Sequence, residues 1–155
     1  MKLQKATQFA LYSILELALE PERQLSAGDI AEKYGISNNH LAKVLRVLGR
    51  AGLVESTRGV GGGYRFAGNA KRTTLLAIIE MFEDIGAQSS DGGDQGVRTD
   101  IGRSLHPVLI EIEEIARATL DSITIETLVN QIKRHAGRGS ETGRAALRLA
   151  TTSAK

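Results

Sequence analysis

The stretch SNNHLAKVLRVLGRAGLVESTRGVGGGYR, from Ser37 to Arg65, contains the pattern that decides the fold. Its first part predicts a short amphipathic helix, because apolar residues recur at the spacing of one helical face. These residues are Leu41, Val44, Leu45 and Leu48. Ser37 supplies an N-cap oxygen, and Gly52 stands where a helix ending near Ala51 takes a left-handed residue.

A β-hairpin follows this helix. Residues 53–58 and 64–66 predict two strands, and the glycine-rich run 59–63 predicts the tip between them. A helix followed by strand, glycine tip and strand is the outline of a wing beside a recognition helix.

Two more helices are predicted in front of the stretch. Apolar spacing indicates a first helix over residues 4–19, which ends before Pro21. Its expected core residues are Phe9, Tyr12, Ile14, Leu15, Ala18 and Leu19. Ser26 and Asp29 form a capping box that opens a second helix at 27–34.

The turn between the second helix and the amphipathic helix is Gly35-Ile36-Ser37. Three residues between two short helices is helix-turn-helix spacing. We therefore expect a mainly α fold with a small β-wing, namely a winged helix-turn-helix DNA-binding domain over residues 1–72.

The second half of the chain predicts a helix at 75–85, a mobile glycine-rich loop at 86–102 and a long helix at 104–123. Pro107 is tolerable if it falls in the first turn of the long helix. Thr73 or Thr74 can cap the first of these helices.

Thr124 can cap a last short helix. We expect residues 73–134 to form a linker helix, the loop and a dimerisation helix. Residues 135–155 are rich in Gly, Ser, Thr and Ala and carry net positive charge, so they predict a disordered tail.

Large aliphatic residues step at threes and fours along the long helix. They are Leu105, Val108, Leu109, Ile112, Ile115, Leu120 and Ile123. This stripe is longer than one small core needs, so it favours a homodimer interface over packing within the chain.

The opposite face of the predicted recognition helix is polar and contains no acidic residue. Its candidate DNA contacts are Asn38, Asn39, His40, Lys43 and Arg46. Asparagine amides at the start of such a helix can bond both edge atoms of adenine in the major groove. The alternative is a solvated surface, because charged helix faces are usually just that.

The wing offers a second set of contacts. Arg58 can enter a narrow minor groove, and a tip without side chains allows close approach to the sugar–phosphate edge. The expected wing contacts are Arg58, Gly61, Gly62, Gly63, Tyr64 and Arg65, with Tyr64 alternatively an anchor to the core. Lys2, Gln4 and Thr7 at the start of the first helix are further candidates for phosphate.

Composition excludes several other classes of function. The chain has 155 residues and no cysteine, so disulfides, thiolate metal sites and thiol nucleophiles are absent. There is no 18-residue apolar run and no signal-peptide pattern, which favours a cytoplasmic protein. The glycines precede a strand and lack the spacing of a phosphate loop.

No enzyme is indicated by the remaining polar residues. The three histidines are dispersed, and His106 with Asp100 or Glu111 is only a weak candidate metal site. The carboxylates of residues 80–84 and 111–114 fit solvated helix faces better than an acid–base pair.

Several motifs together resemble the Rrf2 family of bacterial transcription regulators. They are Phe9-Ala10-Leu11, Ile30-Ala31, Ile36-Ser37, Leu41, Val44-Leu45, Leu48, Ala51-Gly52-Leu53-Val54, the wing Arg58-Gly59-Val60-Gly61-Gly62-Gly63-Tyr64, and Thr124 to Val129. The resemblance covers about residues 1–130 and implies a DNA-binding dimer. Asn39-His40-Leu41 with Lys43 resembles the nitric-oxide-responsive branch.

The chain departs from the family at one point. Many members hold an iron–sulfur cluster on three cysteines in the loop that here runs over 86–102, and this chain has no cysteine. Cysteine ligation of a cluster is therefore excluded, and Gln8, where some relatives offer a non-cysteine ligand, is a poor iron ligand.

We thus expect a homodimer that binds double-stranded DNA at a pseudo-palindromic operator, most simply as a repressor. The alternative is a winged-helix protein-interaction module that does not bind DNA. No cofactor is expected, and the sequence identifies no effector.

Overall fold

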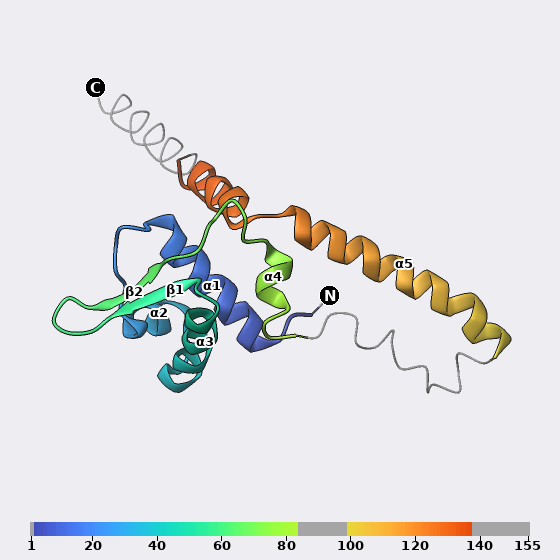
Figure 1. Cartoon of the computed structure of the whole chain (residues 1–155), viewed down its shortest axis with the longest axis horizontal. Coiled ribbons are helices and arrows are strands. Elements are labelled where there is room, and N and C mark those ends of the chain that lie inside the picture. Colours follow the sequence, from blue (N-terminus) through green and yellow to red (C-terminus); the bar gives the residue numbers. More distant parts are fainter. Residues whose placement is uncertain (1, 84–98, 138–155) are drawn as a thin grey trace, which may run out of the picture.

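The computed structural model describes residues 2–83 and 99–137. A body of short helices and one hairpin lies at one end, and a long helix leads away from it (Figure 1). The described elements are α1 (Lys5–Leu19), α2 (Ala27–Tyr34), α3 (Asn38–Arg50), β1 (Val54–Thr57), β2 (Gly63–Phe66), α4 (Leu75–Ile79), α5 (Asp100–Ser122) and a helix at 125–137. No helix in the described ranges is long and apolar enough to cross a membrane.

Helix α1 lies across the body, with α3 packed against it. Its buried residues are Thr7, Ala10, Ser13, Ile14, Leu17 and Ala18. Tyr12 was expected in the core but is 42 % exposed, so that prediction is wrong. The large apolar residues alone predict the wrong buried face for α1, because small and hydroxyl-bearing residues occupy the centre of that face. Ser13 can be buried there since its hydroxyl donates to the carbonyl of Phe9, 2.8 Å away.

Helices α2 and α3 have the predicted bounds and caps. The Ser26 side chain accepts from the Asp29 amide while the Asp29 carboxylate accepts from the Ser26 amide, which completes the capping box. Gly35 ends α2 in the left-handed region at φ 61°, and Ser37 accepts from the His40 amide. The helix-turn-helix prediction is confirmed.

The hairpin is also confirmed, with each strand within one residue of its predicted bounds. Strands β1 and β2 are antiparallel, with Val54 opposite Phe66 and Thr57 opposite Gly63. Leu25, just before α2, forms a bridge to Tyr64 through two backbone hydrogen bonds of 3.0 and 2.8 Å. The hairpin is thereby fixed to the start of α2.

The next two helices differ in length from the prediction. Helix α4 ends at Ile79 rather than at residue 85. Helix α5 begins at Asp100 rather than residue 104, because Thr99 caps it by accepting from the amide of Gly102 at 3.0 Å.

Two predictions change with this earlier start. Residues 100–102 of the predicted 86–102 loop are helical, Thr99 is their N-cap, and residues 86–98 lie outside the described residues. Pro107 is the eighth residue of α5 rather than part of its first turn. A proline there has no amide hydrogen for the carbonyl of Arg103, yet α5 continues past it to Ser122.

The hydrophobic core does not stop at residue 72. Ile78, Ile125 and Val129 belong to the same buried cluster as Ile14 and Leu45. Residues 135–137, expected in the tail, continue the last helix, and residues 138–155 lie outside the described ranges. The helix at 125–137 therefore completes the core of the body instead of trailing from it.

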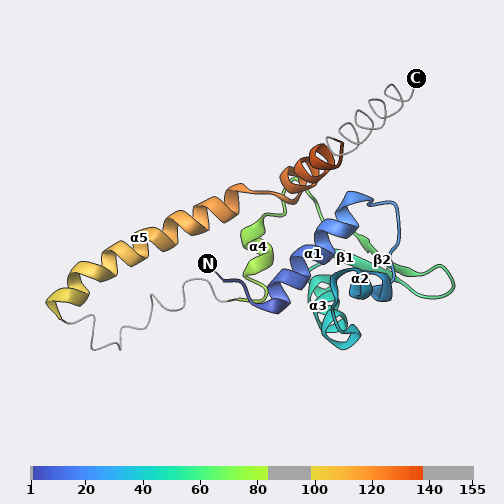
Figure 2. The same ribbon diagram turned by 180° about the vertical axis from the view of Figure 1, so that it is seen from behind.

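Backbone hydrogen bonds hold the end of α5 to this body. The amide of Leu75 donates to the carbonyl of Ile123 and the amide of Ile125 donates to that of Thr73, both at 2.9 Å. The Arg117 guanidinium also contacts the Glu80 carboxylate at 2.6 Å. Helix α5 is thus tied at its C-terminal end, while the rest extends outward (Figure 2).

Replacement of Ile125, which is fully buried, should destabilise the body itself. We expect Ile125→Ala to lower the free energy of unfolding by about 2–5 kcal/mol, since it leaves a cavity among the helices. Denaturant unfolding at fixed protein concentration measures this. Gln131→Ala, on the exposed side of the same helix, is the control, and equal losses in both variants would contradict the shared core.

Candidate nucleic-acid interface

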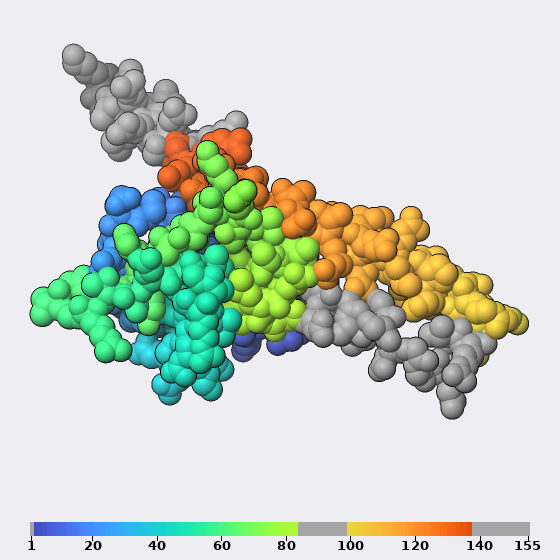
Figure 3. Space-filling view, in the orientation of Figure 1, coloured from blue at the N-terminus to red at the C-terminus, as the bar shows by residue number. Residues whose placement is uncertain are grey.

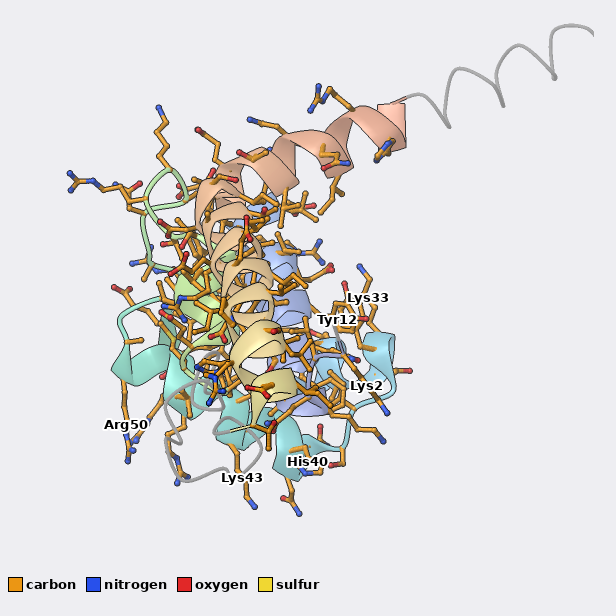
Figure 4. All side chains as sticks on the ribbon, turned by 90° about the vertical axis from the view of Figure 1, so that its right-hand side faces the viewer. Lys2, Tyr12, Lys33, His40, Lys43 and Arg50 are labelled. Carbon is orange, nitrogen blue, oxygen red and sulfur yellow. The ribbon has the colours of Figure 1, made fainter. Side chains whose placement is uncertain are left out.

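Helix α3 separates its side chains into a buried and an exposed face. Leu41, Val44, Leu45 and Leu48 are each at most 3 % exposed. All five predicted contacts on this helix are exposed: Asn38, Asn39, His40, Lys43 and Arg46. Figure 4 shows His40, Lys43 and Arg50 directed away from the body along one edge. The exposed face of α3 is therefore free to enter a groove.

The start of α3 rests against α1. The ring of Phe9 lies 6.4 Å from the ring of His40, measured between centroids, and the planes are tilted by 55°. Phe9 also packs on the buried core. The first turn of α3, where base contacts are expected, is therefore positioned by a side chain of α1 as well as by its own buried face.

A polar cluster that the sequence analysis missed holds α2 to α1. The Glu16 carboxylate accepts from the Lys33 ammonium at 2.6 Å and from the Tyr34 hydroxyl at 2.5 Å. Tyr12 stacks on Tyr34 with ring centroids 4.9 Å apart, which explains its exposed position. The contact involves isolated residues on two different helices, so no sequence pattern predicted it.

The pKa values in this cluster shift in opposite directions. Partial burial acts to raise the pKa of Glu16, but the hydrogen bonds and positive charge of its partners outweigh this and lower it. Burial, followed by the hydrogen bond to Glu16, raises the pKa of Tyr34. Both shifts favour an ionised Glu16 bonded to a neutral Tyr34.

The wing projects beside α3 in the space-filling view (Figure 3). Arg58 is exposed near its tip, while Tyr64 is partly buried and packs on the core. Val60 at the tip is fully exposed, which the sequence analysis did not single out. The Arg65 guanidinium is bound to the Glu55 carboxylate across the hairpin, with nitrogen–oxygen distances of 2.8 and 3.2 Å. Arg65, like the partly buried Tyr64, is thus already engaged within the protein.

Two of the three wing glycines predicted to contact DNA are required by the protein's own backbone. A Cβ on Gly62 would lie 2.3 Å from the carbonyl oxygen of Thr57, and one on Gly63 would lie 2.7 Å from that of Leu25. Gly61 has open space but a φ of 78°. The contact of these glycines with DNA remains a prediction, and the crowding is a separate reason for their presence.

The predicted phosphate contacts at the start of α1 need correction. Thr7 is 0 % exposed, and its hydroxyl donates to the Glu83 carboxylate at 2.5 Å. The Gln4 amide donates to the same oxygen at 2.6 Å. A carboxylate therefore occupies the place expected for a phosphate. Lys2 is exposed and stays a predicted contact.

The aliphatic stripe on α5 is uncovered over most of its length. Leu105, Val108, Leu109, Ile112 and Ile115 are between 50 % and 60 % exposed, and α5 has no buried residue. Ile101, which extends the stripe, is more exposed still and was not predicted. Leu120 and Ile123 are partly buried where α5 meets α4. The part of the stripe from Leu105 to Ile115 is therefore largely exposed in the described chain, and only its C-terminal end packs against the body.

The described residues assemble no candidate metal centre. Across residues 2–83 and 99–137, no three histidine or acidic side chains cluster closely enough to hold a metal ion, so the weak candidate at His106 is not assembled there. The whole sequence contains no cysteine for an iron–sulfur cluster.

A free polar helix face, a wing beside it and a helix-turn-helix core define a winged helix-turn-helix protein. Residues 3–131 match the family model Rrf2, described as an iron-dependent transcriptional regulator. The chain belongs to the Rrf2 family of DNA-binding transcription regulators. The iron dependence in that description does not carry over through cysteine ligands, because the chain has none.

Known relatives agree with this assignment. The chain is 57 % identical over 132 residues to BadM of Rhodopseudomonas palustris, whose name designates it an HTH-type transcriptional regulator, covering 85 % of this chain and 83 % of BadM. It is 38 % identical to the regulator NsrR of Shouchella clausii over 54 % of this chain and 57 % of NsrR. The solved structure of CymR, the global cysteine regulator of Bacillus subtilis, aligns with a TM-score of 0.69 at 26 % identity, over 84 % of this chain and 98 % of CymR.

Gly63→Ala tests whether the wing depends on the close approach of Leu25. We expect the free energy of unfolding to fall by about 1–3 kcal/mol, because the new methyl group must displace backbone rather than a side chain. Gly28→Ala is the control, since its Cβ would meet nothing closer than 3.5 Å. Thermal or denaturant unfolding measures both, and an unaffected Gly63 variant would show that the crowding is relieved at no cost.

Proposed function

We propose that this protein is a homodimeric repressor that binds a pseudo-palindromic operator. The exposed face of α3 reads the major groove, and Arg58 in the wing contacts the adjacent minor groove. The observation that carries the proposal is the pairing of two uncovered surfaces on one chain: a polar face on α3 and an aliphatic face on α5. As a regulator of chromosomal genes, it would act in the cytoplasm.

The aliphatic stripe supports a dimer. Five large aliphatic side chains on one helix are costly to leave in water, at roughly 25 cal/mol per Å² of apolar surface. At about 1.5 Å per residue, the uncovered stretch from Ile101 to Ile115 gives a seam of roughly 21 Å, which suits side-by-side packing with a second copy. A two-fold pair of such helices would present two α3 helices to one duplex.

Two-fold symmetry also supports the form of the operator. Two recognition helices in a dimer enter successive major grooves on one side of the duplex, about 34 Å apart. The bound sites should therefore be inverted repeats with half-site centres about one helical turn apart. Sequencing of genomic fragments retained by the protein identifies the operator, and binding without an inverted repeat would contradict the symmetric dimer.

Lys43→Ala and Arg58→Ala should each weaken operator binding by roughly three- to thirtyfold at fixed salt, because each removes a cation from the proposed contact surface. Titration of a labelled duplex at several salt concentrations measures this. Lys133→Ala removes the same charge from the helix at 125–137 and serves as the matched control. Unchanged affinity in both variants would contradict the proposed contact surface, whereas wild-type duplex binding without strong salt dependence would favour the protein-interaction module that does not bind DNA.

Ile112→Asp should convert the dimer to a monomer and weaken operator binding by at least about tenfold. The substitution would place an unpaired carboxylate in the buried interface between the two α5 helices, which destabilises that interface. Light scattering coupled to gel filtration reports the mass. Ala118→Asp adds the same charge to an exposed position on a different side of α5. A dimer that survives Ile112→Asp would show that the stripe is not the seam.

A further inference from the structure

Helix α1 lacks an N-terminal cap of its own. Its N-cap residue, Gln4, makes no side-chain capping hydrogen bond, and its first turn contains no acidic residue. The first amides of a helix have no partner within the helix, and an anion there is favourable. Helices α2 and α3, by contrast, are capped by the serine that precedes each of them.

The missing cap comes from the other end of the body. Glu83, 79 residues along the chain from Gln4, places one carboxylate oxygen 2.6 Å from the Gln4 amide nitrogen and 2.5 Å from the Thr7 hydroxyl oxygen. In an ordinary capping box, the residue at the position of Thr7 would itself reach back to the N-cap amide. Figures 1 and 2 both show the segment after α4 beside the start of the chain.

We propose that Glu83 is a positioning residue for DNA binding, which fixes the start of α1 and, through it, the first turn of α3. This inference rests on the proposed operator contacts of α3. The buried Thr7 hydroxyl binds Glu83 on one side, and two residues further along α1 the Phe9 ring meets His40. His40 stands in the first turn of α3, beside Asn38 and Asn39.

The sign of the effect separates positioning from simple charge. Glu83 is an anion close to the N-terminal end of α1, so its removal would strengthen binding to a polyanion if charge alone mattered. If Glu83 acts as a cap, its removal weakens binding, because α1 loosens and the first turn of α3 loses its support. The two explanations therefore predict opposite changes in affinity.

The test compares four variants of the full chain on a duplex recovered from the genomic fragments. We expect Glu83→Ala to weaken binding about threefold or more, and Glu83→Gln, which keeps an accepting oxygen, to bind within about twofold of wild type. Thr7→Val, which removes only the donated hydroxyl, should fall between them. Glu22→Gln is the matched control, because it removes the same charge from an exposed position beyond the C-terminal end of α1.

A second measurement reports the cap directly. Hydrogen exchange at the Gln4 amide, followed by NMR, should be on the order of tenfold faster in Glu83→Ala than in wild type, and restored in Glu83→Gln. If Glu83→Ala does not fold, Thr7→Val carries both measurements. Far-ultraviolet circular dichroism and light scattering confirm that each variant is a folded dimer before its affinity is compared.

Three results would overturn the inference. They are tighter or unchanged operator binding by Glu83→Ala, binding by Glu83→Gln as weak as that of Glu83→Ala, and a Gln4 exchange rate that is the same in Glu83→Ala as in wild type. A wild-type chain that retains no duplex would instead refute the proposed function. The exchange measurement would still decide whether Glu83 caps α1, so the two failures are distinguishable.

Discussion

The structure depends on the burial of one face of α3 against α1. Leu41 and Leu48 of α3 are fully buried, as are Ala10 and Ile14 of α1. Because a helix that presents apolar residues on one side must present the rest on the other, this packing is also what leaves the polar face of α3 in solvent. Packing of the core and exposure of the proposed DNA-contact surface therefore have the same cause.

Other contacts refine where that face points. Glu16 ties α2 to α1, and the bridge between Leu25 and Tyr64 ties the wing to the start of α2. The first contact joins two consecutive helices, and the second joins segments 39 residues apart in the chain. Together they give α3 and the wing a fixed relative position, which a groove-reading protein needs because base contacts tolerate little displacement.

The two uncovered surfaces differ in how well they tolerate contact with water. The polar face of α3 is stable in water without a ligand, whereas the aliphatic stripe of α5 is not well suited to solvent. Helix α5 is joined to the body at its C-terminal end through the backbone of Ile123 and Ile125, and Ile125 is itself core. A change in the direction of α5 would therefore alter the packing of the body around Ile125.

The sequence by itself determined the helix-turn-helix, the wing, the exposed polar face of α3 and the absence of thiolate chemistry, because periodicity, caps and residue type are local properties. It misplaced Tyr12 and Thr7, and it placed Pro107 in the wrong turn of α5. The position of Pro107 follows from the local cap at Thr99, whereas only the tertiary structure decided the places of Tyr12 and Thr7. Burial of Thr7 depends on Glu83, exposure of Tyr12 depends on Tyr34, and the core role of Ile125 depends on a backbone bridge to Thr73. Such pairings join residues far apart in the chain, and no spacing within a single segment encodes them.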